Sequence, residues 1–424
     1  MRPQSVVIII TFLSMHAYSQ DARQLRKNAD SLRKSKNYMA AAKAYRASAS
    51  LADFVLPRIN GLYSAADCYN LAGHKDSAFN LLTESIHAGY SDKSHLLQDA
   101  DLNSLHGEAA WQGLVASVKE KEKALNKDPR QAALITEDIH RFWEAYDRAQ
   151  GDSADRVAIY TKFYFDKAST GMQDYMGLKV RSIKYFVDRL DERPKFYRAI
   201  QKNTLQVDSL KPEIYACFEK LKTIYPEARF PDIYFIIGAY TSAGTTSDAG
   251  LLIGINQIAK SDDIPTGELS LWEKNIFAPF QNLPGIISHE LIHFEQDELL
   301  RRDDTTTLFY CIVEGMADFM GEMICGKNIN QRLAIWAKGK EKRIWQAFSR
   351  DMYFNRYGNW IANADQETPD NPADQGYWIG YQICKSYYDR APDKKKAIDD
   401  MLHFKDARDF LRESGWEEKM KAQD

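Results

Sequence analysis

Apolar residues recur at helical spacing along almost the whole chain of 424 residues, and two short segments break this pattern. The segments 232–238 and 250–256 are rich in β-branched residues and bounded by glycine, which is typical of buried strands. Residues 241–248 between them have the composition of a turn. From residue 283 onward the spacing is again helical. We therefore expect an α+β fold that is mostly helical and contains a small sheet.

Length and composition favour a folded protein of two domains. The apolar fraction of 44% and the charged fraction of 27% are near the averages of globular proteins, and the chain is longer than one ordinary domain. The net charge of −3 leaves no basic surplus to neutralise phosphates, so we expect no nucleic-acid binding. A charge-dense segment, 119–123, is either a solvated helix face or the boundary between domains at residues 20–125 and 130–424.

The first 19 residues have the pattern of a cleavable signal peptide. Arg2 is positively charged, residues 6–13 are mostly apolar, and Ala17-Tyr18-Ser19 places small residues before Gln20. An uncleaved anchor would need about 18 apolar residues. No cysteine follows the apolar run, which argues against a lipid anchor. We expect export to the bacterial periplasm or the extracellular space, with no membrane span after the signal is removed.

The cysteines do not form a recognisable framework. They are odd in number, widely scattered and without Cys-x-x-Cys spacing, so we expect neither a disulfide scaffold nor a cysteine-ligated zinc site. The five are Cys68, Cys217, Cys311, Cys325 and Cys384.

The domain at residues 20–125 resembles a tetratricopeptide-type helical repeat, in which each helix pair buries its apolar face against the next. Two stretches match at an offset of 37 residues: Tyr38, Ala41 and Tyr45 in the first, and Lys75, Ala78 and Leu82 in the second. The resemblance implies a protein partner bound through these helices. An alanine-rich helical hairpin without a repeat is the alternative.

A His-Glu-x-x-His motif lies in a helical pattern. Asn282 is a candidate N-cap, and Pro284 falls in the first turn, where its missing N–H costs nothing. His289 and His293 lie one turn apart on one face, so both imidazoles can bind one metal ion. Glu290 points off that face, where it can act as general base on a metal-bound water. Chance produces such a motif in about one or two chains per hundred, so two unrelated histidines are the alternative.

A second apolar helix, expected over residues 308–320, carries two acids four residues apart. Glu314 and Asp318 would be buried there, and buried carboxylates are costly unless they are paired or bound to metal. We expect Glu314 to be the third zinc ligand and Asp318 to accept a hydrogen bond from His289. Gly315 would let the two helices approach closely. The alternative is that both acids line a solvated groove.

These motifs resemble those of the gluzincins, the thermolysin-like clan of zinc metallopeptidases. Glu-Gly-Met-Ala-Asp follows the histidine motif, with 20 residues between His293 and Glu314. Gly244-Thr245-Thr246 and the segment 376–381 are similar to bacterial predicted zinc-dependent proteases, over about residues 130–400. The chain departs from thermolysin in lacking the Asn before the ligand Glu and a downstream catalytic His motif. The metzincins, another class of zinc peptidases, have a third His six residues after the motif, and this sequence has no His six residues after His293.

The resemblance implies a secreted zinc metallopeptidase, with one Zn²⁺ per chain and a peptide or protein as substrate. Its catalytic residues would be Glu290 as general base and Tyr377 as the donor to the oxyanion. Tyr381 and His403 are the second and third choices for that donor. The strand at residues 250–256 would align the substrate as a sheet edge, unless it is a plain core strand.

Two other functions remain open. One is a helical-repeat binding or scaffold protein with a structural or degenerate metal site. The other is a zinc enzyme that hydrolyses a non-peptide amide or ester.

Overall fold

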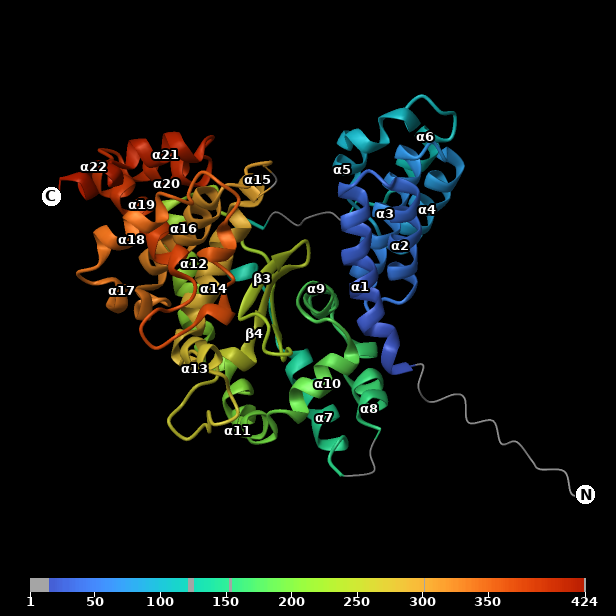
Figure 1. Ribbon diagram of the computed structural model, residues 1–424. Coiled ribbons are helices and arrows are strands. Elements are labelled where there is room, and N and C mark those ends of the chain that lie inside the picture. Colours follow the sequence, from blue (N-terminus) through green and yellow to red (C-terminus); the bar gives the residue numbers. More distant parts are fainter. Residues whose placement is uncertain (1–14, 121–125, 152–154, 301, 423–424) are drawn as a thin grey trace, which may run out of the picture. The chain divides into compact units, whose positions relative to one another are not determined.

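The computed structural model describes residues 15–120, 126–151, 155–300 and 302–422 (Figure 1). The predicted signal peptide lies mostly outside these residues, and helix α1 begins at Met15. The chain divides into two compact units. The first consists of Met1–Lys123, Asp155–Thr161 and Gln173–Asp188, and the second of Ala124–Ala154, Lys162–Met172 and Arg189–Asp424.

The first unit is built on four consecutive helices, each packed on the next. Alanines fill the contacts between them, and Ala41 and Ala78 are fully buried at equivalent places. The helices of this unit that precede residue 120 are α1 (Met15–Lys34), α2 (Tyr38–Ser50), α3 (Val55–Leu71), α4 (Lys75–His87), α5 (Lys93–Gln98) and α6 (Trp111–Ser117).

The turns within the first unit repeat at the offset found in the sequence. Lys36 and Gly73, 37 positions apart, both have positive φ, at 60° and 83°. In each turn the next residue donates its backbone N–H to a carbonyl five residues earlier, from Asn37 to Leu32 and from His74 to Tyr69. This is the Schellman ending of a helix. The α1–α2 and α3–α4 pairs therefore share one turn geometry.

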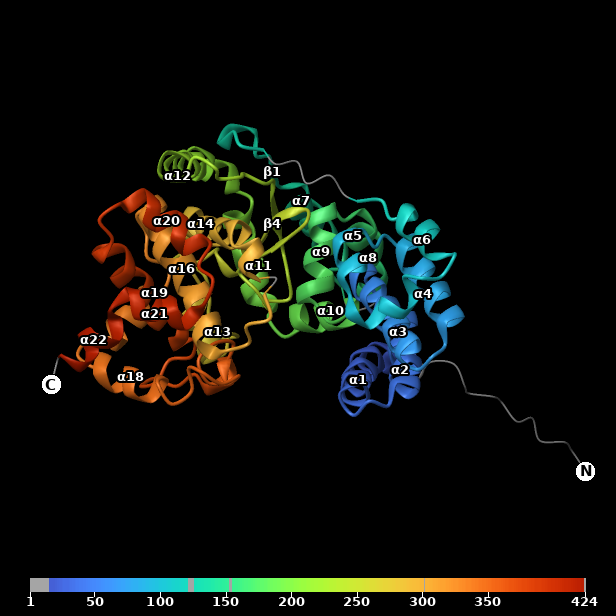
Figure 2. The same cartoon turned by 90° about the horizontal axis from the view of Figure 1, so that it is seen from above.

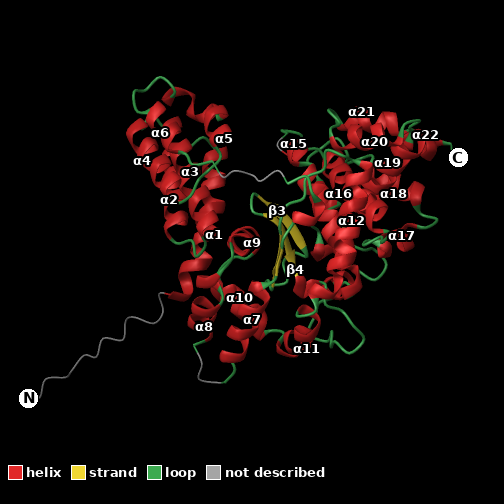
Figure 3. Ribbon diagram, turned by 180° about the vertical axis from the view of Figure 1, so that it is seen from behind, coloured by secondary structure: helices red, strands yellow, loops and turns green. Residues whose placement is uncertain are grey.

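The second unit contains a four-stranded sheet, which Figure 3 shows in yellow among the helices. Its order is β1 (Leu134–Ile135), β2 (Ile233–Ile236), β4 (Gly250–Gly254) and β3 (Gly244–Ser247). Strands β1, β2 and β4 run parallel, and β3 is antiparallel to β4. The mostly helical α+β class is confirmed.

Two details of the predicted sheet are wrong. Residues 241–248, expected as a turn, contain β3, whose Gly-Thr-Thr-Ser sequence is polar because this edge strand is only half-buried. The strand at Gly250–Gly254 is not an edge, because β2 and β3 pair with its two sides. It is fully buried, as a core strand should be. The substrate-aligning edge expected there is therefore absent from this strand.

Three helices form layers beside the sheet. Helix α14 (Leu283–Glu295) packs on β3 and β4, α16 (Thr307–Cys325) packs on α14, and α19 (Gln375–Arg390) packs on α16 (Figure 2). Asn282 is the N-cap residue of α14, although its side chain makes no capping bond, and Pro284 lies in the first turn. Gly326 ends α16 in the left-handed conformation.

The other helices between residues 137 and 300 are α7 (Glu137–Arg148), α8 (Arg156–Phe163), α9 (Thr170–Lys179), α10 (Ile183–Asp191), α11 (Pro194–Thr204), α12 (Lys211–Ile224), α13 (Leu271–Ile276) and α15 (Asp297–Leu300). Most of α8, α9 and α10 belongs to the first unit. Toward the C-terminus follow α17 (Gln331–Ala337), α18 (Glu341–Phe348), α20 (Lys394–Leu402), α21 (Ala407–Ser414) and α22 (Trp416–Lys421). Of the helices that the structure describes, none is long and apolar enough to cross a membrane.

Glycines set the spacing of the helical layers. A side chain at Gly315 would collide with the backbone at Gly380, and one at Gly380 would collide with the Cys311 carbonyl. Gly315 therefore brings α16 against α19, and its predicted role against α14 is wrong. Gly321 has that role, because a Cβ there would lie 3.2 Å from the backbone N of His289.

Replacing Gly380 with alanine should destabilise the second unit by about 3 kcal/mol, because the new methyl group would overlap backbone atoms of α16. Urea unfolding followed by circular dichroism measures the loss. Gly358→Ala is the matched control, since the space beside Gly358 is open, and it should change stability by less than about 0.5 kcal/mol. Equal stability of the two variants would contradict the close approach of α16 and α19.

Candidate metal centre

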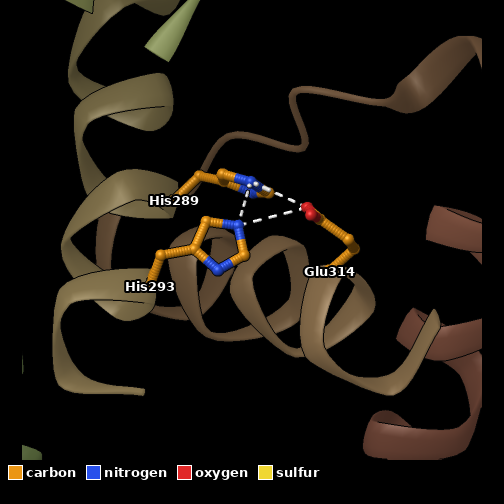
Figure 4. A group of neighbouring side chains, drawn as sticks. All are labelled: His289, His293 and Glu314. Atoms are coloured by element: carbon orange, nitrogen blue, oxygen red, sulfur yellow. Dashed lines mark hydrogen bonds and ion pairs between the residues drawn. The ribbon is translucent and has the colours of Figure 1, made fainter. Parts of the chain in front are cut away.

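His289 and His293 of α14 point toward Glu314 of α16 (Figure 4). The two Nε2 atoms are 3.0 Å apart. The Glu314 Oε2 atom is 3.1 Å from Nε2 of His293 and 3.6 Å from Nε2 of His289. All three ligand atoms lie within 4.8 Å of one another, and the described part of the chain holds no second group of this kind. Residues from two helices thus converge on one point.

The spacing of these atoms fits a bound zinc ion. Ligand atoms about 2.0–2.1 Å from a tetrahedral zinc ion stand about 3.3 Å apart. The separations of 3.0, 3.1 and 3.6 Å lie on either side of that value. Two imidazole nitrogens and a carboxylate oxygen are also donors that zinc accepts. The donor set therefore fits zinc in both chemistry and distance.

A carboxylate orients His289. The Nδ1 atom of His289 is 2.8 Å from Oδ1 of Asp318, and Asn330 donates to Oδ2 of the same carboxylate at 2.7 Å. A ring whose Nδ1–H is held by a carboxylate presents the lone pair of Nε2 to the ion. Asn330 lies beyond α16 in a loop, and the histidine motif carries no signal for it.

An amide orients His293 in the same way. Its Nδ1 atom is 2.7 Å from Oε1 of Gln296, and the Gln296 amide donates to the Val313 carbonyl at 3.1 Å. Gln296 is fully buried. Gln296 was not among the predicted site residues, although its place three residues after His293 puts it on the same helix face.

The charges of the group compensate one another. Burial opposes a charge on His289, but hydrogen bonds to Asp318 and Glu314 outweigh it and raise the pKa of this imidazole well above its ordinary value. Burial likewise opposes a charge on His293, and the charge of Glu314 raises its pKa. Burial disfavours ionised Glu314, but the two imidazoles lower its pKa. A metal ion would compete with the protons on the imidazoles.

The residues predicted as catalytic lie beside this group. The Glu290 carboxylate is buried and lies against Gly244 of β3, where any side chain would collide with it. The Tyr377 ring of α19 stacks on the His289 ring at 6.1 Å between centroids. Burial, followed by the charge of Glu314, raises the pKa of the Tyr377 phenol well above its ordinary value, so the phenol keeps its proton.

The two other candidates for a donor are held elsewhere. The Tyr381 hydroxyl donates to Glu322 at 2.9 Å. The His403 ring lies 2.9 Å from the carbonyl of Asp399, and its ring faces that of Tyr225. Neither residue belongs to the group around Glu314.

Fold and site together define an α+β protein with a candidate metal centre between two buried helices. A model of the family of gliding motility protein GldB matches residues 122–418. The match spans more than half of the chain, so the protein belongs to this family, which is a family of lipoproteins. No curated protein and no solved structure matches the chain.

The family match overturns the predicted membership of the gluzincins. The matched residues, 122–418, include all of the segment that carried the resemblance, and the model is one of gliding motility proteins. The predicted secreted zinc peptidase, with its hydrolase and metalloprotease chemistry, is therefore wrong as the main interpretation. The motif was misleading because a His pair one turn apart requires only a helix, and a helix does not define a peptidase. The missing Asn and the missing downstream His motif already departed from thermolysin.

The family also bears on the predicted export. Lipoproteins are exported and held at a membrane, which agrees with an exported chain. The first cysteine in this sequence is Cys68, which is buried within α3.

Changing Asp318 to asparagine should lower the pKa of His289 in metal-free protein. The carboxylate stabilises the imidazolium, and without it the burial that opposes the charged ring is only partly compensated by the hydrogen bond with Glu314. His289 would then lose its proton at a lower pH than in the parent protein. Titration of the imidazole signals by nuclear magnetic resonance, in the presence of a chelator, measures the change.

Glu322→Gln is the control for this titration, because it makes the same carboxyl-to-amide change one turn further along α16. It should leave the pKa of His289 unchanged. A His289 pKa that is equal in the Asp318→Asn variant and in the parent would contradict the described pairing.

Proposed function

We propose that this protein acts in gliding motility as an exported binding or scaffold protein, whose second unit is held together by one zinc ion. His289, His293 and Glu314 would hold the ion. The observation that carries the proposal is the convergence of their three ligand atoms between two helices of a gliding-family fold. Membership of the family of gliding motility protein GldB supplies the link to gliding motility.

The role proposed for the metal is structural. Zinc bound here would supply positive charge beside Glu314 and cross-link α14 to α16, which adds to the free energy of folding. Asp318 and Gln296 would keep both imidazoles turned toward the ion through their Nδ1 atoms. His289, His293 and Glu314 would supply three of the four ligands of a tetrahedral ion.

The proposed partner of this scaffold is a protein of the same machinery. Residues before 122 lie outside the matched family segment, and the helical pairs α1–α2 and α3–α4 are among them. Helical pairs with a common turn geometry are a usual framework for presenting a protein-binding surface. We place the protein in the periplasm or at the cell surface.

Protein purified without chelator should contain about one equivalent of zinc per chain. Glu314→Gln should retain less than half of this content, because one of three ligands is lost, and Asp318→Asn should weaken zinc binding about 10–100-fold. Glu322→Gln is the control and should bind zinc as the parent does. Elemental analysis and a competition titration with a chromophoric chelator measure both quantities. Zinc content below half an equivalent in the parent, without recovery when zinc is added, would contradict the metal proposal.

The scaffold proposal predicts that Glu290 is dispensable for gliding. In a strain whose gliding requires this chain, Glu290→Gln should spread like the parent, because its side chain is not among the proposed ligands. His293→Ala should lose spreading together with zinc. Colony spreading is scored alongside the amount and zinc content of each variant. Loss of spreading by Glu290→Gln at normal abundance and zinc content would contradict the scaffold role and indicate that a proton-transfer group is needed.

A further inference from the structure

Two cysteines that lie 108 positions apart in the sequence meet beside the first turns of α14. Cys217 belongs to α12, and Cys325 is the last residue of α16. The Cys217 thiol lies near enough to the Cys325 thiol and to the Ser288 hydroxyl of α14 to interact with both electrostatically. A Cβ built at Gly285 on the same helix would lie 3.7 Å from Sγ of Cys325. Both sulfur atoms therefore lie against one segment of α14.

An ion pair holds the same two segments together. Lys327, two residues after Cys325, donates to Glu213 at 2.6 Å. Glu213 lies one turn before Cys217 and on the same face of α12. Helices α12 and α16 also pack directly on each other. The approach of the two thiols is thus fixed by backbone packing and by a neighbouring charge pair.

We propose that Cys217 and Cys325 form a disulfide bond in the exported protein, which makes this pair a redox site between α12 and α16. The inference draws on the export assigned above and is independent of the proposed metal ion. Free thiols that face each other become oxidised outside the reducing cytosol. The three other cysteines are buried within helices, where no described contact brings two of them together.

The oxidant is a disulfide of a thiol–disulfide oxidoreductase or of glutathione. The thiolate of one cysteine attacks the oxidant, forms a mixed disulfide and releases one thiol. The other cysteine, after losing its proton, then attacks that mixed disulfide and releases the second thiol. Two electrons pass from the pair to the oxidant, and the two protons end on the released thiols.

The bond would close a long loop and clamp the end of the helix that carries Glu314 and Asp318. A cross-link of this kind stabilises a fold by limiting the freedom of the unfolded chain. Oxidation should therefore raise the Tm of the second unit without changing its zinc ligands.

The full chain, with zinc added, is incubated with oxidised glutathione and compared with a sample kept in dithiothreitol. Peptide mapping without reduction should recover Cys217 linked to Cys325, with three free thiols left and a Tm several degrees higher. Cys325→Ser should abolish both the linked peptide and the Tm shift. Cys384→Ser is the matched control and should retain both.

Two results would overturn the inference. One is a folded protein that keeps five free thiols in oxidised glutathione, and the other is glutathione attached to Cys217 without a link to Cys325. Zinc content measured on the same samples separates the two proposals. Normal zinc content without the disulfide would contradict only this inference. The disulfide without bound zinc would contradict only the metal proposal.

Discussion

The second unit depends on the pairing of two imidazoles on α14 with two carboxylates on α16. Both helices are apolar on most faces, so an unpaired charge between them would be costly. Asp318 pairs with His289, and Glu314 lies between the two rings. Gly321 lets the backbones approach closely enough for these contacts. The polar group thus pairs defined positions of the two helices.

The site shows how little a short motif says about function. Two histidines one turn apart and a carboxylate that faces them from the next helix make a place for a metal ion. What the ion does depends on the rest of the chain. The matched family is one of gliding motility proteins, and the catalytic features that define thermolysin are incomplete in this sequence. Likeness in fold and motif therefore predicted more about the site than about the reaction.

Local patterns in the sequence predicted the helices and the central members of the site. The turn spacing of His289 and His293, and the four-residue spacing of Glu314 and Asp318, follow from helix geometry alone. The pairing of α14 with α16 could be predicted from the free-energy cost of burying unpaired carboxylates. Glycine-bounded, β-branched runs likewise indicated β2 and β4.

Contacts between distant segments could not be predicted in this way. Asn330 reaches Asp318 from a loop, and the role expected of Gly315 belongs to Gly321, because residue spacing does not say which neighbour a helix face will meet. The edge strand β3 was missed because its residues are polar and half-buried. The thiol pair of Cys217 and Cys325 joins segments 108 positions apart, and its spacing fits no motif.

The central claim is that three side chains of two helices bind one zinc ion. A crystal structure of zinc-loaded protein, with anomalous data collected on both sides of the zinc absorption edge, tests it most directly. The account predicts a single strong anomalous peak about 2.0–2.1 Å from Nε2 of His289, Nε2 of His293 and a carboxylate oxygen of Glu314. Anomalous density at another place, or a Glu314 carboxylate turned away from both imidazoles, would contradict it.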